Sequence, residues 1–328
     1  LYSIVLPETF VMNNNIVAFP PPEKTMVTPT PAQPEAAIGD DVIYEIRVPE
    51  IPANAVMHDV TITDTLDPSL FYEVGSASDI SANGFAITDT SAGNNINLVI
   101  SQIPAGQQAI IRLPARVDNN LNANAGDRFD NTVIYRYANT PGGTQKFGGT
   151  DTTASTLTII EPALTVNKTV VNTTKPGAPD AGDILTYTVT LTASGGAVPG
   201  DIYSDAFDVS MTDSLSPGLL YIDGSQTVDG GNTIDLPVKV GDGSITTPQS
   251  LSWSLAEANA DIDVVEGTTV TVTYDVLVLD SVLANQNLSN SVDIQWSSRD
   301  GPDVNERDGS DAPLLLLNDY FNLVPAFA

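Results

Sequence analysis

The stretch VTITDTLDPSLFY at Val60–Tyr72 recurs later in the chain as VSMTDSLSPGLLY at Val209–Tyr221. In both copies apolar residues alternate with polar ones, and a proline-containing turn precedes a second short apolar run. Alternation with a period of two places successive side chains on opposite faces of a β-strand, so that one face can be buried. Self-similarity of this kind indicates that the chain is built from two copies of one strand-rich unit.

Further landmarks recur in the same order. They are GDDVIYEI (Gly39–Ile46) with GDILTYTV (Gly182–Val189), AGQQAIIRL (Ala105–Leu113) with EGTTVTVTY (Glu266–Tyr274), DNTVIYRYANTPG (Asp130–Gly142) with SNSVDIQWSSRDG (Ser289–Gly301), and more weakly EKTMVTPT (Glu23–Thr30) with NKTVVNTT (Asn167–Thr174). Short alternating segments separated by turn residues are typical of an immunoglobulin-like β-sandwich. We therefore expect an all-β chain with two tandem immunoglobulin-like β-sandwich domains, residues 20–161 and 162–312, flanked by apolar terminal segments, residues 1–19 and 313–328.

Composition excludes several classes of partner. The 328 residues include 41 acidic and 12 basic side chains, which give a formal net charge of −29. No basic patch is available to displace the counterions of nucleic acid, and the sign is wrong for an anionic membrane surface. The charge suits either a saline, cation-rich exterior or a surface that simply needs to stay soluble. Cysteine is absent, so no disulfide can stabilise the domains.

The ends of the sequence bear on its location and its partners. The four leucines at Leu314–Leu317 fall far short of the roughly 18 apolar residues of a membrane span, so we expect no membrane insertion within this chain. The chain opens at Leu1 without a basic and then apolar signal, so we expect any export signal or anchor to lie outside it. The apolar terminal segments either complete the chain's own sandwiches or exchange as strands with other copies of the chain. We expect an extracellular or cell-surface location.

Three polar residues interrupt strand faces that are otherwise apolar. In the second repeat they are Lys168, Asp213 and Asn290, and in the first repeat they are Lys24, Asp64 and Asn131. Charges do not enter a sandwich core unpaired, because desolvation costs several kcal/mol per ion. One interpretation is a buried lysine–aspartate ion pair that is hydrogen-bonded to the asparagine. The other is a spontaneous isopeptide bond, in which a lysine made neutral by burial attacks an asparagine polarised by a protonated aspartate.

These motifs carry a resemblance. LTVNK (residues 164–168), the G-D-x-x-x-Y strand, VSMTDSLSPGL and the late N-S-V resemble the repeat family called domain of unknown function eleven. That resemblance implies immunoglobulin-like modules of bacterial or archaeal surface proteins. The order Lys, Asp, Asn is also similar to that of isopeptide-forming modules in Gram-positive pilins and adhesins. This implies a bond from Lys168 to Asn290 and another from Lys24 to Asn131. Lys24 follows PPPE rather than an alternating apolar run, which predicts weaker burial in the first repeat.

An acidic segment late in the second repeat offers oxygen ligands. Its candidate calcium ligands are Asp300, Asp303, Asn305, Asp308 and Asp311. Calcium takes six to eight oxygens from flexible turns, although the spacing here differs from that of an EF-hand. The segment is therefore either a calcium site or a solvated acidic turn.

Catalytic patterns are weak in this sequence. The sole histidine, His58, aligns with Phe207 of the second repeat, which makes it an ordinary strand residue, and no G-x-S-x-G elbow is present. We expect no enzymatic activity. The predicted function is that of an extracellular structural subunit that assembles into a filament or surface layer. The alternative is a stalk or spacer fragment of a large cell-surface adhesin.

Overall fold

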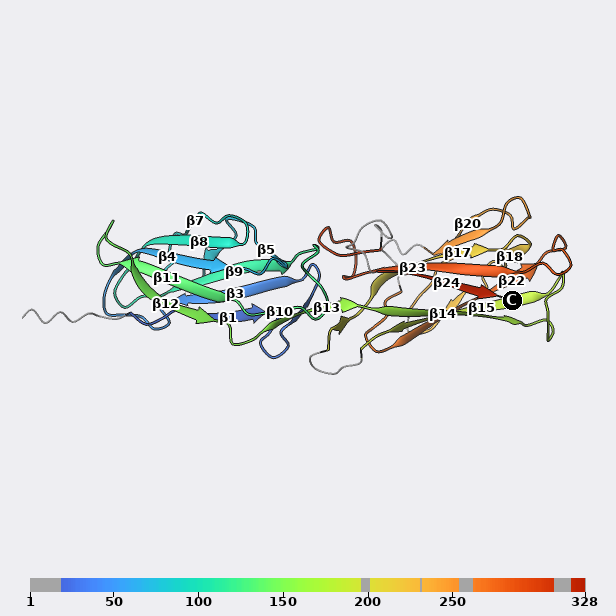
Figure 1. The fold of residues 1–328 in the computed structure, drawn as a ribbon, viewed down its shortest axis with the longest axis horizontal. Helices are drawn as coiled ribbons and strands as arrows, with labels where there is room; N and C mark the ends of the chain where they lie inside the picture. The colour runs from blue at the N-terminus through green and yellow to red at the C-terminus, as the bar shows by residue number, and fades with distance from the viewer. Residues whose placement is uncertain (1–18, 196–200, 231, 254–261, 310–319, 328) are drawn as a thin grey trace, which may run out of the picture.

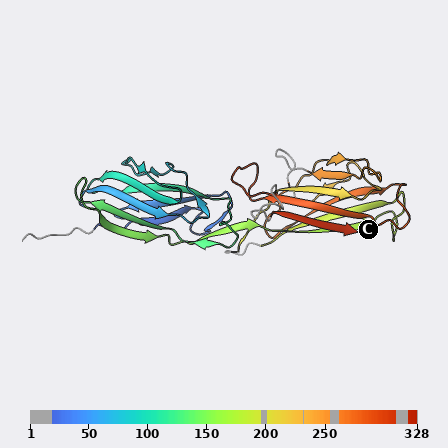
Figure 2. The ribbon, with the colours of Figure 1, turned by 45° about the horizontal axis from the view of Figure 1, so that its top comes forward.

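The computed structural model describes residues 19–195, 201–230, 232–253, 262–309 and 320–327. Over these residues the chain contains strands and turns but no helix, which confirms the predicted all-β fold. The strands form two β-sandwiches that lie end to end along one long axis (Figures 1 and 2). Within the described part, no helix is long and apolar enough to cross a membrane.

The first sandwich packs two five-stranded sheets. One sheet has the order β1 (Glu23–Thr28), β3 (Asp41–Val48), β9 (Ala109–Val117) and β5 (Leu70–Phe71), with β6 (Ser78–Asp79) also paired to β9. The other has the order β12 (Lys146–Thr152), β11 (Thr132–Ala138), β4 (Met57–Thr65), β8 (Asn95–Ile103) and β7 (Thr88–Asp89). Their inner faces enclose one apolar core drawn from residues 19–159.

The second sandwich has the same strand order as the first. Its first sheet runs β14 (Leu164–Asn172), β15 (Ile184–Ala193), β22 (Thr269–Val278) and β18 (Leu219–Tyr221), with β19 (Thr227–Val228) paired to β22. Its second sheet runs β20 (Val238–Val240), β21 (Ser250–Trp253), β17 (Phe207–Leu215), β23 (Ser289–Ser297) and β24 (Phe321–Phe327). This second sheet is given from the opposite edge, so that β20 corresponds to β7 and β24 to β12. A separate apolar core is drawn from residues 164–320.

Sequence alternation accounts for the strands and their burial. In β15, every second residue from Leu185 to Leu191 is buried, and the threonines between them are partly exposed. β-Branched and aromatic residues suit such a pleated, half-buried surface. Leu185, Tyr187, Val189 and Leu191 therefore face the core because of their spacing alone, and the same logic places the polar residues of interest inside.

β4 and β17, which are equivalent strands of the two sandwiches, each contain a backbone irregularity near their start. Asp59 and Asp208 have positive φ angles of 49° and 47°, each where the register of its strand shifts against the neighbouring strand. The Asp59 carboxylate accepts a hydrogen bond from the Gly142 amide at 2.6 Å, and Asp208 accepts one from the Gly301 amide at 3.0 Å. The two aspartates thus hold the turns that follow β11 and β23, which gives Asp59 a structural role.

The chain crosses between the sandwiches as nearly continuous strand. β13 (Leu157–Pro162) pairs with β2 (Glu35–Ala37) and β10 (Arg128–Phe129) of the first repeat, and with β16 (Tyr203–Ser204) of the second. Only Ala163 separates β13 from β14. β13 therefore contributes pairing to strands of both repeats.

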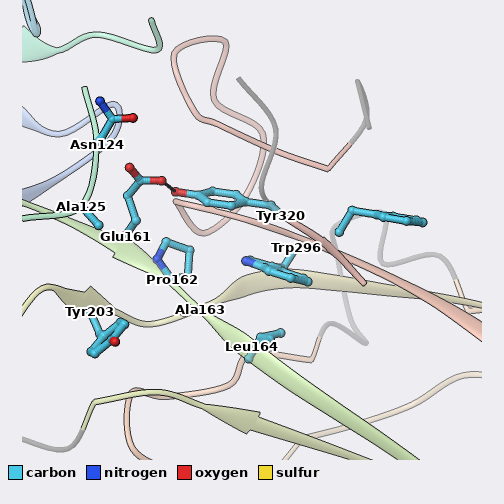
Figure 3. Close-up of a pocket in the computed structure, with 10 residues that line it drawn as sticks. Asn124, Ala125, Glu161, Pro162, Ala163, Leu164, Tyr203, Trp296 and Tyr320 are labelled. Atoms are coloured by element: carbon cyan, nitrogen blue, oxygen red, sulfur yellow. Dashed lines mark hydrogen bonds between the residues drawn. The ribbon is translucent and has the colours of Figure 1, made fainter. Parts of the chain in front are cut away.

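A segment after β23, which we call the junction loop (residues 298–309), ties the two domains together. Its Arg307 is 4% exposed, and its guanidinium group donates four hydrogen bonds. It donates to the Glu161 carboxylate at 3.0 Å, to the Asn119 side-chain oxygen at 3.1 Å, and to the carbonyl oxygens of Asn120 and Ala123 at 3.0 Å each. The Tyr320 hydroxyl donates to the same Glu161 oxygen at 2.9 Å (Figure 3). The junction loop therefore anchors the second domain to loops of the first.

The terminal segments differ in what the structure describes. Residues 1–18 and 310–319 lie outside the described residues. β24, near the C-terminus, pairs antiparallel with β23 of the same chain, with Ser289 opposite Phe327 and Gln295 opposite Phe321. This part of the C-terminal segment completes the chain's own second sandwich, one of the two alternatives that the sequence left open.

Replacing Arg307 by Ala is expected to destabilise the junction by about 3–5 kcal/mol, because the Glu161 carboxylate stays buried without its partner charge. Small-angle X-ray scattering should then show a broader distribution of interdomain distances, and the unfolding midpoint should fall. Arg47→Ala is the matched control, since the Arg47 side chain is 41% exposed in its ion pairs and should contribute only about 0–1 kcal/mol. Unchanged scattering and stability for Arg307→Ala would contradict the assignment.

Candidate functional site: a buried lysine, aspartate and asparagine in each sandwich

The second sandwich brings its three predicted polar residues into one core site. Lys168 comes from β14 in the first sheet, whereas Asp213 and Asn290 come from the adjacent strands β17 and β23 of the opposite sheet. Lys168, Asp213 and Asn290 are 5%, 0% and 1% exposed. The strand period of two that buries their apolar neighbours also carries these three side chains inside. The site therefore spans the two sheets.

A chain of contacts links these residues. The Lys168 ammonium lies 2.5 Å from the Asp213 Oδ2 atom, and neither side chain is exposed. The hydroxyl group of Tyr274, on β22, donates to the same Asp213 oxygen. Asn290 Nδ2 in turn donates to the Tyr274 hydroxyl at 3.2 Å. One carboxylate oxygen is thus shared by the lysine and by the tyrosine that holds the asparagine.

Aromatic rings wall the lysine off from water. Lys168 Nζ lies 5.0 Å from the centroid of the Tyr187 ring and 5.9 Å from that of Tyr274. The two rings stack with centroids 5.6 Å apart. Ring faces attract a cation, but they replace few of the hydrogen bonds that an ammonium makes in water. The Asp213 carboxyl therefore remains the principal partner of the Lys168 ammonium.

The first sandwich builds the same site from equivalent strands. Lys24 on β1 forms an ion pair with Asp64 on β4, and neither side chain is exposed. Lys24 Nζ also lies 4.6 Å from the Tyr44 ring centroid. Asn131, just before β11, is 3% exposed and carries its carboxamide into the same region, beside Asp64 and Tyr44. The weaker burial expected for Lys24 is wrong, because pairing of β1 with β3 supplies the regular strand that the proline-rich sequence concealed.

Burial shifts the acid–base equilibria of both sites. Desolvation lowers the pKa of Lys168 and that of Lys24 to about 8, although the neighbouring aspartates act in the opposite direction. Desolvation also raises the pKa of Asp213 and that of Asp64, against the opposing effect of the lysines. Both shifts disfavour the charged forms, as expected for ionisable groups in a low-dielectric core. Burial therefore moves each site toward a neutral amine and a neutral carboxyl group, against the mutual attraction of the charged pair.

The remaining oxygen atoms support this protonation state. Among the described residues, Asp213 Oδ1 and Asn290 Oδ1 are buried and have no hydrogen-bond donor of standard geometry. The same holds for Asp64 Oδ1 and Asn131 Oδ1 in the first sandwich. Buried acceptors normally have partners. A proton on the aspartate oxygen would supply a donor to the asparagine carbonyl and thereby polarise it for attack by an amine.

The acidic segment proposed as a calcium site makes other contacts in the structure. Asp303 accepts hydrogen bonds from the backbone and side chain of Asn305 at 2.9 and 3.0 Å, and it lies 3.2 Å from Arg299. Asp308 lies opposite Ser297 in an isolated bridge. Asp311 lies outside the described residues. Over the ranges that the structure describes, no three histidine, cysteine or acidic residues are grouped to hold a metal, so calcium binding here stays a prediction.

A pocket of about 470 Å³ lies where the domains meet (Figure 3). Apolar and aromatic residues provide much of its lining, including Pro162, Leu164, Tyr203 and Trp296. Its lining carboxylate, Glu161, already accepts hydrogen bonds from Arg307 and Tyr320. The carboxylate that lines this pocket is thus already engaged in holding the junction.

The sequence alone does not identify two residues that matter in the structure, one at the core site and one at the domain junction. Tyr274 occupies an inward strand position, where the sequence pattern indicates only another aromatic core residue. The contact of its hydroxyl group with Asp213, on the opposite sheet, cannot be predicted from that pattern. Arg307 sits in an acidic loop, and its partner Glu161 is 146 residues away. An arginine isolated among acidic residues is the only local signal that could have drawn attention to the junction loop.

No family model and no curated protein match this chain. Solved structures do match at low similarity. The major pilin subunit of Bacillus cereus has 10% identity and a TM-score of 0.34, with 82% of this chain covering 57% of that one. A C-terminal fragment of the major pilin of Streptococcus agalactiae has 12% identity and a TM-score of 0.33, with coverages of 92% and 96%. A non-cellulosomal cohesin from the archaeon Archaeoglobus fulgidus has 14% identity and a TM-score of 0.30, with coverages of 43% and 91%.

These matches do not bear on function. This chain spans little more than half of the Bacillus cereus protein. The resemblance to the repeat family called domain of unknown function eleven stays a prediction from the sequence. The function must therefore be argued from the site itself.

Without its cross-link, the second sandwich should become more stable as the pH rises above 8. In an Asn290→Ala variant no Lys168–Asn290 bond can form, and the folded-state pKa of Lys168, about 8, lies below its ordinary value of 10.5. Between these values the unfolded chain binds a proton that the folded chain does not, so the free energy of unfolding increases, by up to about 1.4 kcal/mol per pH unit.

Urea unfolding at pH 7.5, 8.5 and 9.5 measures this effect. Both tryptophans of the chain, Trp253 and Trp296, lie in the second sandwich, so their fluorescence reports on that domain. A variant that also carries Lys168→Met and Asp213→Asn removes both titrating groups and should lose the increase. Equal pH dependence in the two variants would refute the lowered pKa of Lys168.

Proposed function

We propose that this protein is a non-enzymatic, extracellular structural subunit whose two sandwiches are each cross-linked by a Lys–Asn isopeptide bond. One observation carries the proposal: the same buried lysine, aspartate and asparagine recur at equivalent strands of both repeats, between opposite sheets. A merely tolerated ion pair is costly to bury, and two equivalent ones double that cost. Covalent closure removes the cost permanently.

The reaction is self-directed and occurs once in each site. The neutral amine of Lys168 attacks the side-chain carbonyl carbon of Asn290 while Asp213 donates a hydrogen bond to the carbonyl oxygen. A bond forms between Nζ and Cγ, the bond from Cγ to Nδ2 breaks, and one amine proton moves to Nδ2, which leaves as ammonia. Lys24, Asp64 and Asn131 do the same in the first repeat.

The cross-links suit a protein that bears force without disulfides. Each joins the first strand of one sheet to the segment that begins the late strand β11 or β23 of the other. By analogy with a disulfide that closes a loop of about 100 residues, each bond should add on the order of 4–5 kcal/mol. The sandwiches would then resist being pulled apart from their ends.

Intact mass spectrometry tests the proposal directly. Each bond removes one ammonia, so the purified chain should weigh about 34 Da less than its sequence mass, about 17 Da for each site. Asn290→Ala should retain only the loss in the first repeat, and Asn131→Ala only the loss in the second. An unshifted mass for the unaltered chain would disprove both cross-links.

Self-assembly is the second element of the proposal, and a sheet edge supports it. β20 pairs only with β21 in the described sheet, and its Val238 and Val240 side chains are 64% and 68% exposed. The equivalent edge of the first sandwich is β7, which is polar (Thr88–Asp89). An exposed apolar edge strand offers unpaired backbone groups to a strand from another chain. The apolar sequence of residues 1–18 is a suitable partner in a second copy.

Electron microscopy of the purified chain should show filaments or ordered layers, and Val238→Lys with Val240→Lys should abolish them by charging the β20 edge. Val74→Lys is the control, because Val74 is also exposed (51%) but lies in the first sandwich, away from this edge. Deletion of residues 1–18 should have the same effect as charging β20. Assembly that survives both changes would exclude this interface.

The alternative function, a stalk or spacer of a large adhesin, is supported by the junction. Strand β13 continues almost directly into β14, and Arg307 anchors the junction loop across the domain boundary. A spacer needs such a fixed, extended arrangement but needs no self-association. A chain that stays monomeric at all concentrations, while retaining both cross-links, would favour the stalk.

A further inference from the structure

The two sites differ at one position, which the strand register identifies. In the second sandwich Tyr187 of β15 lies opposite Tyr274 of β22. In the first sandwich the equivalent Tyr44 of β3 lies opposite Leu113 of β9. Tyr274 and Leu113 are both fully buried. Only the second site therefore has a hydroxyl group at this position.

That hydroxyl changes how the asparagine is held. Asn290 Nδ2 donates to the Tyr274 hydroxyl at 3.2 Å, which fixes the orientation of its carboxamide. In the first site, both Nδ2 and Oδ1 of Asn131 are buried without a hydrogen bond of standard geometry among the described residues. Attack on a carboxamide requires a defined orientation of the carbonyl group, and pre-orientation of the reacting atoms lowers the barrier.

The hydroxyl also completes a path for the proton that the reaction must move. Lys168 Nζ and the Tyr274 hydroxyl both contact Asp213 Oδ2, and the hydroxyl contacts Nδ2, the atom that leaves as ammonia. Asp213 can accept a proton from the attacking amine while Tyr274 passes its own proton to Nδ2 and takes one from Asp213. The product amide keeps one proton on Nζ, ammonia carries away three, and no proton is gained or lost.

We propose that Tyr274 orients Asn290 and relays a proton to its leaving nitrogen, so that the second sandwich cross-links faster than the first. This inference rests on the proposed isopeptide bonds. It assigns a catalytic role to a residue outside the lysine, aspartate and asparagine, and it predicts an asymmetry between two otherwise equivalent sites.

The test follows cross-linking in the freshly made full-length chain. After a short pulse of cell-free synthesis, samples are quenched in acid over time and digested. The joined and unjoined peptides of each repeat are then quantified by mass spectrometry. In the unaltered chain the Lys168–Asn290 peptide should appear before the Lys24–Asn131 peptide. Simultaneous appearance, or the reverse order, would overturn the inference without needing any variant.

Tyr274→Phe should slow the second cross-link roughly 100-fold, in the range expected for loss of one proton-transfer group, and leave the first at its normal rate. The first repeat is thus an internal control in the same molecule. Tyr221→Phe is the matched control, because its hydroxyl bonds Gln226 rather than the site, while its ring also lies near Tyr274. A normal second rate in Tyr274→Phe overturns the relay but leaves the isopeptide bonds standing.

The rate of the second cross-link should rise with pH as Lys168 becomes neutral, because burial lowers the pKa of its amine to about 8. Addition of ammonium or imidazole, small proton donors, should not restore Tyr274→Phe, because the site is buried. Absence of ammonia loss from both repeats of the unaltered chain would instead defeat the proposed function, and this inference with it.

Discussion

The structure depends on a contact between a lysine and an aspartate in the core of each sandwich. Removing two charges from water costs several kcal/mol per ion, so the surrounding side chains must compensate. Lys168 is accordingly enclosed by the rings of Tyr187 and Tyr274, and Asp213 accepts from both the ammonium and a phenol. Because lysine and aspartate come from opposite sheets, the contact also fixes how the sheets pack.

The two repeats share their strand order and buried polar residues, and they differ at one core position and in one loop. The strand order, the buried polar residues and the bulge aspartates Asp59 and Asp208 recur in both copies. At one core position Leu113 and Tyr274 differ, which alters how the asparagine is held. After the last shared strand, the first repeat turns directly into β12, whereas the second inserts the junction loop before β24. The junction loop of the second repeat thereby holds the first repeat through Arg307.

The strands and their inward-facing residues can largely be predicted from the sequence, because the alternation of apolar and polar residues is a local pattern. The inward positions of VSMTDSL identify both the core and the aspartate that interrupts it. Lys24 is harder to place because three prolines precede its strand, and only pairing with β3 shows its burial. Arg307 and Glu161 could not be paired from the sequence, since their contact depends on the relative placement of two domains. The Tyr274 hydroxyl likewise acquires its role only from the opposite sheet.

Positive side chains are scarce in this chain, yet three of them are buried. Of 12 lysines and arginines, Lys24, Lys168 and Arg307 are 2%, 5% and 4% exposed, and each meets a carboxylate. Arginine cannot lose its charge, so the junction remains an ion pair. Lysine can, and in the proposed reaction an ammonium, a carboxylate and a carboxamide become an amide, a neutral carboxylic acid and free ammonia. Each cross-linked site then contains no charge, so the desolvation that opposes the ion pair favours the cross-link.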